Sequence, residues 1–252
     1  MVIDSSKKTI TLEDGTSVAI DSPEGFRLLS HLWTMAGISQ KYSYGFSWLG
    51  RPIIQMPDDM IRIQEVITQV KPNLIIETGV AHGGSLVYYA SLLRLLHRGC
   101  GALVIGVDRE IREVNRIAIA EARALYRLPL HTIEGDSVAA STIEKVDEII
   151  DPDAWVIPPK CLVVLDSNHS YQHVLAEMRA YAKYVSIGSY MVVSDGIIEE
   201  WSEDNPARAA RDYVAENSDR WKIVEPEWPF NEGHVRNRVT GWPGCFVQRV
   251  GK

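Results

Sequence analysis

The sequence predicts an α/β fold built on a mostly parallel, doubly wound sheet. Short apolar runs alternate with segments of helical periodicity five times from residue 57 onward, which is typical of strand–helix–strand units. The runs are apolar throughout, as expected for strands that helices cover on both faces. Right-handed crossovers bring the carboxyl ends of these strands to one edge of the sheet, where open α/β sheets bind ligands.

The first 56 residues differ from this pattern and are expected to form an N-terminal extension of a main domain at residues 57–252. We expect a short hairpin first and then a helix near residues 23–36. The aromatic stretch at residues 42–48 (YSYGFSW) follows neither helical nor strand periodicity. We therefore expect this stretch, after the hairpin and the helix, to lie over the main domain as an arm.

The main domain is expected to begin with a helix at residues 57–70. Pro57 suits the first turn, Asp58 and Asp59 suit the positive end of the helix dipole, and the Lys71-Pro72 pair stops the helix. Apolar residues recur at steps of three and four residues, which marks one buried helix face: Met60, Ile63, Ile67 and Val70.

The remaining elements follow in regular order. Strands are expected at residues 73–77, 102–107, 130–133, 162–165 and 190–193. Helices are expected at residues 85–97, 111–125, 142–150, 171–184 and 206–216. The last two strand candidates, 221–224 and 245–250, have no helix between them and are expected to pair as an antiparallel hairpin with a long loop.

An acidic residue stands at or just after the end of each of the five parallel strands: Glu77, Asp108, Asp136, Asp166 and Asp195. Buried apolar strands do not need acids at their ends. Asp is a common helix N-cap, but capping favours Ser, Thr and Asn as well, so capping alone explains one such acid better than all five. The pattern therefore predicts a polar site at this edge of the sheet.

The loop after the first of these strands, residues 77–85 (ETGVAHGGS), allows a ligand to approach the backbone closely. It has neither the Gly-Lys-Ser/Thr of a P-loop nor the GxGxxG spacing. The acid that opens it disfavours a pyrophosphate and favours cationic groups, such as the amino group and sulfonium of S-adenosylmethionine. Asp108 is placed to accept ribose hydroxyls, and the region of Asp136 is where an adenine edge would lie. The expected cofactor-binding residues are Glu77, Thr78, Gly79, His82, Gly83, Gly84, Ser85, Asp108, Arg109, Asp136, Ser137 and Asp166.

Asp166 and Asp195 end the fourth and fifth strands beside this crevice. Two carboxylates, with water and a substrate oxygen, form a hard-oxygen site suited to Mg²⁺. His169 brings an imidazole within reach of the same point, and imidazole takes a proton from a hydroxyl readily near neutral pH.

Two other interpretations use the same region. Asp166, His169 and His173 could form a two-histidine, one-carboxylate iron site, provided that the helix starts early enough to put both histidines on one face. That site would imply an oxygenase. An NAD-linked oxidoreductase lacks its GxGxxG spacing, and a non-enzymatic binding module would leave the acid pair without a role.

Residues 42–55 (YSYGFSWLGRPIIQ) resemble the entry segment of the cephalosporin hydroxylase/rhamnosyl O-methyltransferase family. The loop at 77–85 is similar to that family's cofactor loop, and residues 165–171 (LDSNHSY) with 192–196 (VVSDG) resemble its metal region. The resemblance covers about residues 25–250. It implies a Rossmann-like class I methyltransferase fold, with a seven-stranded sheet and an antiparallel C-terminal strand, and the cofactors S-adenosylmethionine and Mg²⁺.

The resemblance also implies roles for single residues. His169, three residues after Asp166, matches the general base of related macrolide-sugar O-methyltransferases. Relatives often have Glu-Asp where this chain has Ser194-Asp195, so the Ser194 hydroxyl or a water is expected to fill the metal site. The expected reaction is methylation of a hydroxyl on a deoxysugar such as rhamnose, within a glycoside, glycolipid or natural product. An iron hydroxylase and a methyltransferase of catechol-type phenols are the alternatives.

Composition limits the partners and the setting. A net charge of −7 over 252 residues disfavours nucleic acid. Neither an apolar run of about 18 residues nor the apolar core of a signal peptide is found, so we expect no membrane insertion and a cytoplasmic location. The three cysteines are expected to be reduced: Cys100, Cys161 and Cys245. The extension and the resemblance together suggest a homo-oligomer that acts on a small-molecule or glycoside acceptor.

Overall fold

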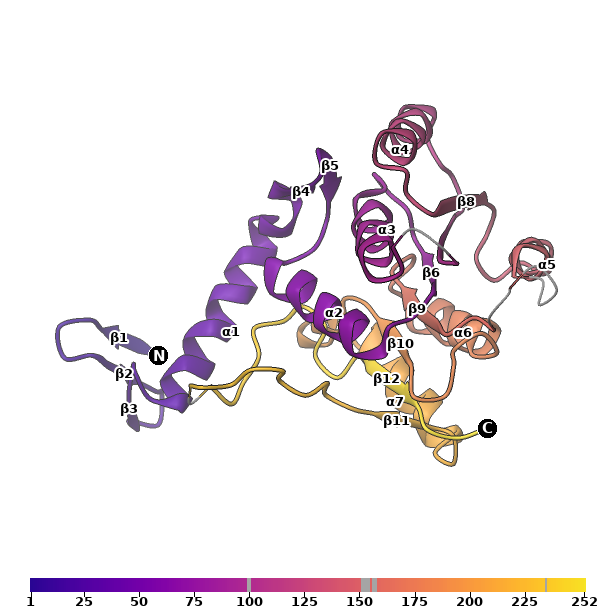
Figure 1. Cartoon of the computed structure of the whole chain (residues 1–252). Helices are drawn as coiled ribbons and strands as arrows, with labels where there is room; N and C mark the ends of the chain where they lie inside the picture. Colours follow the sequence, from indigo (N-terminus) through magenta and orange to yellow (C-terminus); the bar gives the residue numbers. More distant parts are fainter. Residues whose placement is uncertain (99–100, 151–154, 156–157, 234) are drawn as a thin grey trace.

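The computed structural model describes residues 1–98, 101–150, 155, 158–233 and 235–252. Its main sheet has seven strands in the order β11-β12-β10-β9-β6-β7-β8 (Figure 1). The neighbours from β10 to β8 are parallel, whereas β12 is antiparallel to both β10 and β11. The predicted fold, including the antiparallel C-terminal pair, is therefore confirmed. The strands are β6 (Leu74–Thr78), β7 (Leu103–Asp108), β8 (Leu130–Glu134), β9 (Cys161–Leu165), β10 (Tyr190–Val193), β11 (Trp221–Ile223) and β12 (Phe246–Arg249).

Helices lie on both sides of these strands, with α2, α3 and α4 packed in series on one side and α6 and α7 packed together on the other (Figure 1). All six helices expected in the main domain are present, and the largest displacement of an end is three residues, at the end of α6. Their bounds are α2 (Pro57–Val70), α3 (Gly84–Leu96), α4 (Glu113–Tyr126), α5 (Ala140–Ile149), α6 (Tyr171–Tyr181) and α7 (Pro206–Glu216), and a short 3-10 helix, η3 (Gly196–Glu200), follows β10.

The central strands form the core. Every residue of β6, β9 and β10 is buried, and burying one such Val, Leu or Ile side chain contributes about 1.5–3 kcal/mol. This burial on both faces is why the sequence of these strands is continuously apolar. Cys161 and Cys245 are buried and free, as expected; Cys100 lies outside the described residues. Within the described part of the chain, no helix is long and apolar enough to span a membrane.

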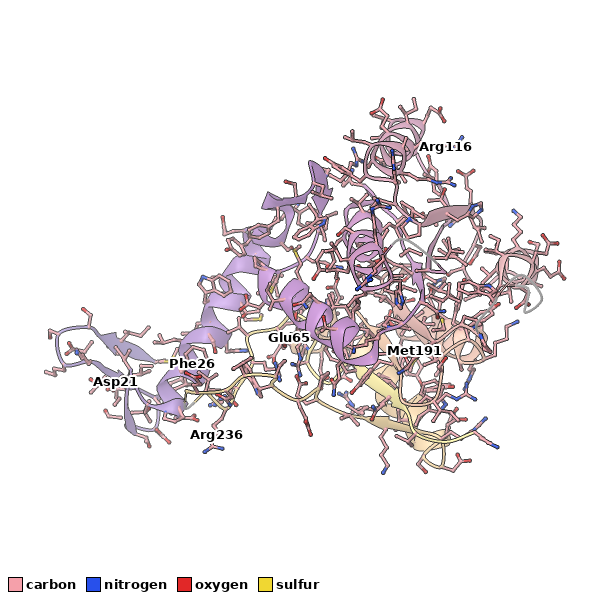
Figure 2. All side chains as sticks on the ribbon, in the orientation of Figure 1. Asp21, Phe26, Glu65, Arg116, Met191 and Arg236 are labelled. Carbon is pink, nitrogen blue, oxygen red and sulfur yellow. The ribbon has the colours of Figure 1, made fainter. Side chains whose placement is uncertain are left out.

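The N-terminal residues form a small antiparallel sheet and one long helix. The expected hairpin has a third strand, giving β1 (Val2–Asp4), β2 (Thr9–Thr11) and β3 (Ser17–Ala19), followed by α1 (Pro23–Ser39). These elements project away from the main sheet and carry many outward side chains (Figures 1 and 2). Helix α1 buries only Gly25 and Thr34 among the described residues, so it has little contact surface with the main domain.

The aromatic stretch does lie on the main domain. It forms a 3-10 turn, η1 (Tyr42–Gly45), and a hairpin of β4 (Phe46–Trp48) and β5 (Arg51–Ile53). Trp48 packs edge-on against Tyr88 of α3, with ring centroids 4.8 Å apart, and its Nε1 donates to Ser91 Oγ at 3.0 Å. This contact brings the residues after β5 to the carboxyl edge of the sheet.

Candidate active site

Two adjoining cavities lie at the carboxyl ends of the parallel strands. The β7–β8 cavity, of about 330 Å³, is lined by side chains that include Asp108, Arg109, Asp136, Ser137 and His173. The acid-cluster cavity, of about 210 Å³, is lined by side chains that include Gln55, His82, Ser85, His169 and Asp195. Four residues line both cavities: Gly79, Ala81, Asp166 and Ser167. A ligand that extends through both would pass this shared wall.

Gly79 sets the position of that wall. Its φ is +88°, and a Cβ there would come within 1.9 Å of the Asp166 carbonyl oxygen. Only glycine adopts this conformation and this approach without strain. The end of β6 can therefore touch the end of β9, where Asp166 follows the paired Leu165.

The Asp108 carboxylate fixes the backbone of the loop at residues 77–85 by hydrogen bonds. Its Oδ2 accepts hydrogen bonds from the backbone N–H groups of Val80 at 2.7 Å and Ala81 at 3.1 Å, while Oδ1 accepts from Glu110 N at 3.1 Å. The carboxylate also lines the β7–β8 cavity. The ribose role predicted for Asp108 stays a prediction, and the structure adds a role in fixing the loop.

Arg51 and Asn115 hold the other side of the loop. Arg51 Nε donates to the His82 carbonyl oxygen at 3.1 Å, and its Nη2 donates to Asn115 Oδ1 at 3.2 Å. Asn115 Nδ2 in turn donates to the Ala81 carbonyl oxygen at 2.9 Å. Neither role can be predicted from the sequence, because each residue is more than 30 positions from its loop partner.

Three residues of the loop are not placed as expected. Glu77, Thr78 and Gly83 are buried and do not belong to the described lining of either cavity. Glu77 Oε2 accepts from Ser85 Oγ at 2.7 Å, and burial raises the pKa of Glu77 to about 8. These residues support the loop; the lining comes from Gly79, His82, Gly84 and Ser85.

The expected acid cluster is assembled. One ligand atom each from Asp166, His169 and Asp195 lies within 4.8 Å of the others, and His169 Nε2 is 3.2 Å from Asp195 Oδ2. Burial raises the pKa of Asp166 well above its ordinary value, and the carboxyl groups of Asp195 and Glu77 raise it further. The backbone of Asp195 is left-handed, with φ +58°, which turns the chain from β10 into η3.

Ser194 lies beside this cluster without lining the described cavity. It follows Val193, which pairs with Leu165, so it is the neighbour of Asp166 across the two strands. Its side chain is 1% exposed and faces the Asp166 carboxyl, and a hydrogen bond from Ser194 opposes part of the rise that burial causes in the pKa of Asp166.

His173 is not brought to the cluster, so the arrangement expected for an iron site is wrong. Helix α6 begins at Tyr171, which leaves His169 in the preceding turn and separates the two imidazoles. His173 Nε2 instead lies 3.1 Å from Ser137 Oγ and 3.4 Å from Glu177 Oε1. The hydrogen bond with Glu177 raises the pKa of His173.

Two buried polar side chains escaped the sequence analysis. Glu177 is fully buried and accepts from Ser167 Oγ at 2.6 Å. Gln55 is buried against the acid-cluster cavity, and its Nε2 donates to Tyr89 Oη at 3.4 Å. For Glu177 the sequence holds no signal, because a single Glu in a helix is usually exposed. For Gln55 the signal was present, since it ends the segment that resembles the family's entry segment.

The arrangement suits two kinds of chemistry. Carboxylate oxygens at the ends of neighbouring strands form a site for a hard divalent cation. An imidazole beside them can remove a proton from a hydroxyl held at that cation. The β7–β8 cavity adds a second compartment whose acids can accept hydrogen bonds from hydroxyl and amino groups.

A family model for rhamnosyl O-methyltransferase/CmcI matches residues 40–250 of this chain. The chain belongs to this family. The match includes the loop, the acid cluster and the aromatic stretch, and it confirms the resemblance that the sequence motifs indicated.

Curated relatives in this family are named rhamnosyl O-methyltransferase. That of Mycobacterium tuberculosis is 33% identical over 140 residues, which cover 56% of this chain and 52% of the relative. That of Mycobacterium leprae is 30% identical over 149 residues, which cover 59% of each chain. The chain thus spans little more than half the length of the curated relatives it matches.

Solved structures share the fold. An apo structure of CmcI superposes with a TM-score of 0.55 at 19% identity, covering 83% of this chain and 78% of that one. A CmcI structure described as Mg-SAM gives 0.55 at 18% identity, covering 82% and 78%. The apo structure of CalS11, a TDP-rhamnose 3'-O-methyltransferase, gives 0.53 at 17% identity, covering 92% and 96%.

Proposed function

We propose that this chain is an S-adenosylmethionine- and Mg²⁺-dependent O-methyltransferase that methylates a hydroxyl of a sugar such as rhamnose. One observation carries the proposal: the cluster of Asp166, His169 and Asp195 lies next to a second cavity at the sheet edge, in a chain of this family. The names of the mycobacterial relatives and of CalS11 support a sugar acceptor. The Mg-SAM complex of CmcI supports the two cofactors.

The β7–β8 cavity fits the nucleoside half of S-adenosylmethionine. We assign the ribose hydroxyls to Asp108, and the adenine edge to Asp136 and Ser137. The methionine half would run past Gly79 and Asp166 into the acid-cluster cavity, where Ser85 and the backbone of the loop line the wall. Arg109 lines the β7–β8 cavity together with Asp108.

The acid cluster fits Mg²⁺ on the chemistry of its donors. Asp166 and Asp195 would hold the ion through carboxylate oxygens, the ligand type that Mg²⁺ prefers. The Ser194 hydroxyl, or a water held by it, stands beside Asp166 where relatives often have a further carboxylate. When bound, S-adenosylmethionine supplies an electrophilic methyl group, and Mg²⁺ supplies a Lewis acid for the acceptor hydroxyl.

His169 serves as the general base in this proposal. Its imidazole would accept the proton of the acceptor hydroxyl, and the Asp195 carboxylate, 3.2 Å from Nε2, would stabilise the imidazolium that forms. The loop at residues 77–85, held by Asp108, Arg51 and Asn115, and the close approach at Gly79 determine where a ligand can lie relative to this base. Such alignment is a large part of the rate enhancement in group transfer.

A methyl-transfer assay tests the proposal. The full chain is incubated with methyl-labelled S-adenosylmethionine and methyl α-L-rhamnoside, with catechol as a parallel acceptor. We expect label in the sugar, loss of transfer with a chelator, and recovery with Mg²⁺. Transfer that is unaffected by the chelator would contradict the metal role, and transfer to catechol alone would contradict the sugar acceptor.

A further inference from the structure

Helix α6 turns three polar side chains toward the interior of the molecule. His173, Glu177 and Tyr181 follow one another at steps of four residues, so they share one face of the helix. Glu177 and Tyr181 are fully buried, and the side chain of His173 is 22% exposed. The inward face of a helix is normally apolar, so this polar row requires partners inside the protein.

The partners belong to the loops that follow β8 and β9. Tyr181 Oη donates to the Ser137 carbonyl oxygen at 3.0 Å, and His173 Nε2 lies 3.1 Å from Ser137 Oγ. Glu177 Oε1 accepts from Ser167 Oγ at 2.6 Å. Strands β6 and β7 lie between β8 and β9 in the sheet, so strand register does not join these two loops directly. The polar face of α6 therefore links them.

Both loops form part of the β7–β8 cavity. Ser137, Ser167 and His173 line it, and Glu177 supports two of these residues from the protein interior. The hydrogen bonds of α6 thus determine how far apart the two sides of the cavity stand. A binding site must be held to within about 0.5 Å of its productive geometry, so a shift of either loop would weaken the fit of a ligand.

Glu177 is the centre of this arrangement. Its Oε1 lies 3.4 Å from His173 Nε2 and also accepts from Ser167, while its Oε2 has no hydrogen-bond partner within the described residues. A buried carboxyl group costs stability unless its oxygens are hydrogen-bonded, so packing alone does not account for Glu177. The hydrogen bond with Glu177 raises the pKa of His173 and keeps Nε2 directed inward, which fixes the imidazole at the cavity surface.

We propose that Glu177 is a positioning residue for the cofactor: through His173 and Ser167 it holds the loops after β8 and β9 at the separation that the nucleoside half of S-adenosylmethionine requires. This inference rests on the proposed function for the place of the nucleoside. It assigns no contact with the cofactor to Glu177 itself, whereas the imidazole of His173 forms part of the cavity wall beside Ser137. Glu177 therefore acts on affinity for the cofactor rather than on the methyl-transfer step.

Calorimetric titration of the full chain with 5′-methylthioadenosine tests the inference, because this probe contains the nucleoside without the amino and carboxyl groups of the methionine half. Glu177→Gln keeps the size of the side chain and removes its charge, and we expect binding to weaken by about tenfold. His173→Gln, at a partly exposed position, should weaken it by about fivefold. The matched controls are Glu216→Gln, in an exposed ion pair with Arg179 of α6, and His131→Gln at an exposed position of β8. Both should leave the affinity within about twofold of the wild type.

A double variant separates positioning from general destabilisation. Because Glu177 acts through His173, Glu177→Gln should have a smaller effect on affinity in the His173→Gln background than in the wild type. In the methyl-transfer assay, Glu177→Gln should raise KM for S-adenosylmethionine and leave kcat within about threefold. Fully additive losses in the double variant, or an unchanged affinity in Glu177→Gln, would overturn the inference.

NMR titration of the histidines in the ligand-free protein gives a second readout. The His173 resonance, assigned with the His173→Gln variant, should titrate at lower pH in Glu177→Gln than in the wild type. Asp136, which also raises the pKa of His173, is the same in both proteins. Identical titrations would overturn the link between the two residues, whatever the protein binds. Binding of the nucleoside without methyl transfer to any acceptor would count against the proposed function alone, and a wild type that does not bind the nucleoside would contradict both.

Discussion

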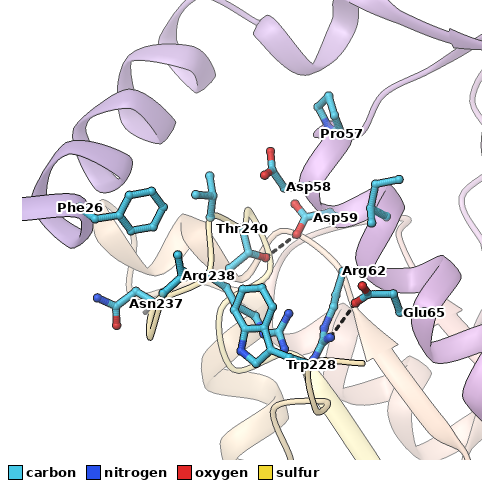
Figure 3. A pocket seen from close by; sticks show the side chains of 13 residues that line it. Phe26, Pro57, Asp58, Asp59, Arg62, Glu65, Trp228, Asn237, Arg238 and Thr240 are labelled. Atoms are coloured by element: carbon cyan, nitrogen blue, oxygen red, sulfur yellow. Dashed lines mark hydrogen bonds and ion pairs between the residues drawn. The ribbon is translucent and has the colours of Figure 1, made fainter. Parts of the chain in front are cut away.

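The edge of the sheet and the contact between α2 and the loop before β12 are assembled in different ways. At the sheet edge, Asp108, Asp166 and Asp195 each lie within two residues of a strand end, and strand register places them along one edge, with Asp166 and Asp195 on neighbouring strands. The contact of α2 joins segments that share no register, and Asp59 meets Thr240 (Figure 3) and Gly241 across more than 180 positions of sequence. Register therefore fixes the proposed chemistry, whereas single long-range contacts attach α2 to the C-terminal loop.

The largest loss of methyl transfer is expected when a proposed metal ligand at the sheet edge is removed. Asp195→Ala should lower methyl transfer by about 10³-fold or more, because it removes a ligand of the cation that stabilises the developing charge. Affinity for S-adenosylmethionine, measured by calorimetry, should stay nearly unchanged. Asp147→Ala, on the surface beside Lys183, is the matched control. Full turnover in Asp195→Ala would exclude the metal role of this residue.

His169→Ala separates the base from the metal. The variant should lose at least about 10²-fold in kcat, since a positioned general base contributes 10²–10⁴-fold. Its requirement for Mg²⁺ should remain, because Asp166 and Asp195 are intact. A loss below tenfold would reduce His169 to a structural residue.

Gly79→Ala tests the wall between the two cavities of the sheet edge. Gly50→Ala is the control, because Gly50 also has a positive φ, +80°, but open space around its Cβ position. Both variants carry the backbone strain, and only Gly79→Ala meets the Asp166 carbonyl. Urea unfolding should show a loss for Gly79→Ala that is about 2 kcal/mol larger than the loss for Gly50→Ala. Equal losses would mean that the close approach is not tight.

Asp59→Asn tests the contact of α2 with Thr240 and Gly241 of the loop before β12. Burial raises the pKa of Asp59 to about 7, so the folded protein keeps a proton that the unfolded chain releases near pH 4. The free energy of unfolding should therefore fall as pH rises from about 4 to 7. The variant lacks this group, so between pH 5 and 7.5 its unfolding free energy should fall less than that of the wild type, by about 1 kcal/mol or more. Parallel pH curves for the two proteins would refute this assignment.

The same difference explains what the sequence could predict. Periodicity located β6 to β10 and their helices, and the acids at the strand ends marked Asp166 and Asp195 before any contact was known. Asp59 looked like a favourable residue of a helix start, yet the structure buries it against the loop before β12. Arg51 escaped for the same physical reason. Its partners, His82 and Asn115, lie in elements that only tertiary packing brings near, and a sequence pattern carries no record of that packing.

Some expectations stay predictions. A homo-oligomer is one, and the exposed side chains of α1, among them Leu32 and Trp33, are where its interface could be sought. The division of the chain into an N-terminal extension and a main domain at residue 56 is another.

The central claim is that the edge of the sheet binds S-adenosylmethionine beside a Mg²⁺ site. Calorimetric titration of the full chain with S-adenosylmethionine, with and without Mg²⁺, tests it most directly. We predict binding with a Kd in the micromolar range under at least one of these conditions, and the same titration of Asp108→Ala should show weaker binding. No binding under either condition would contradict the account.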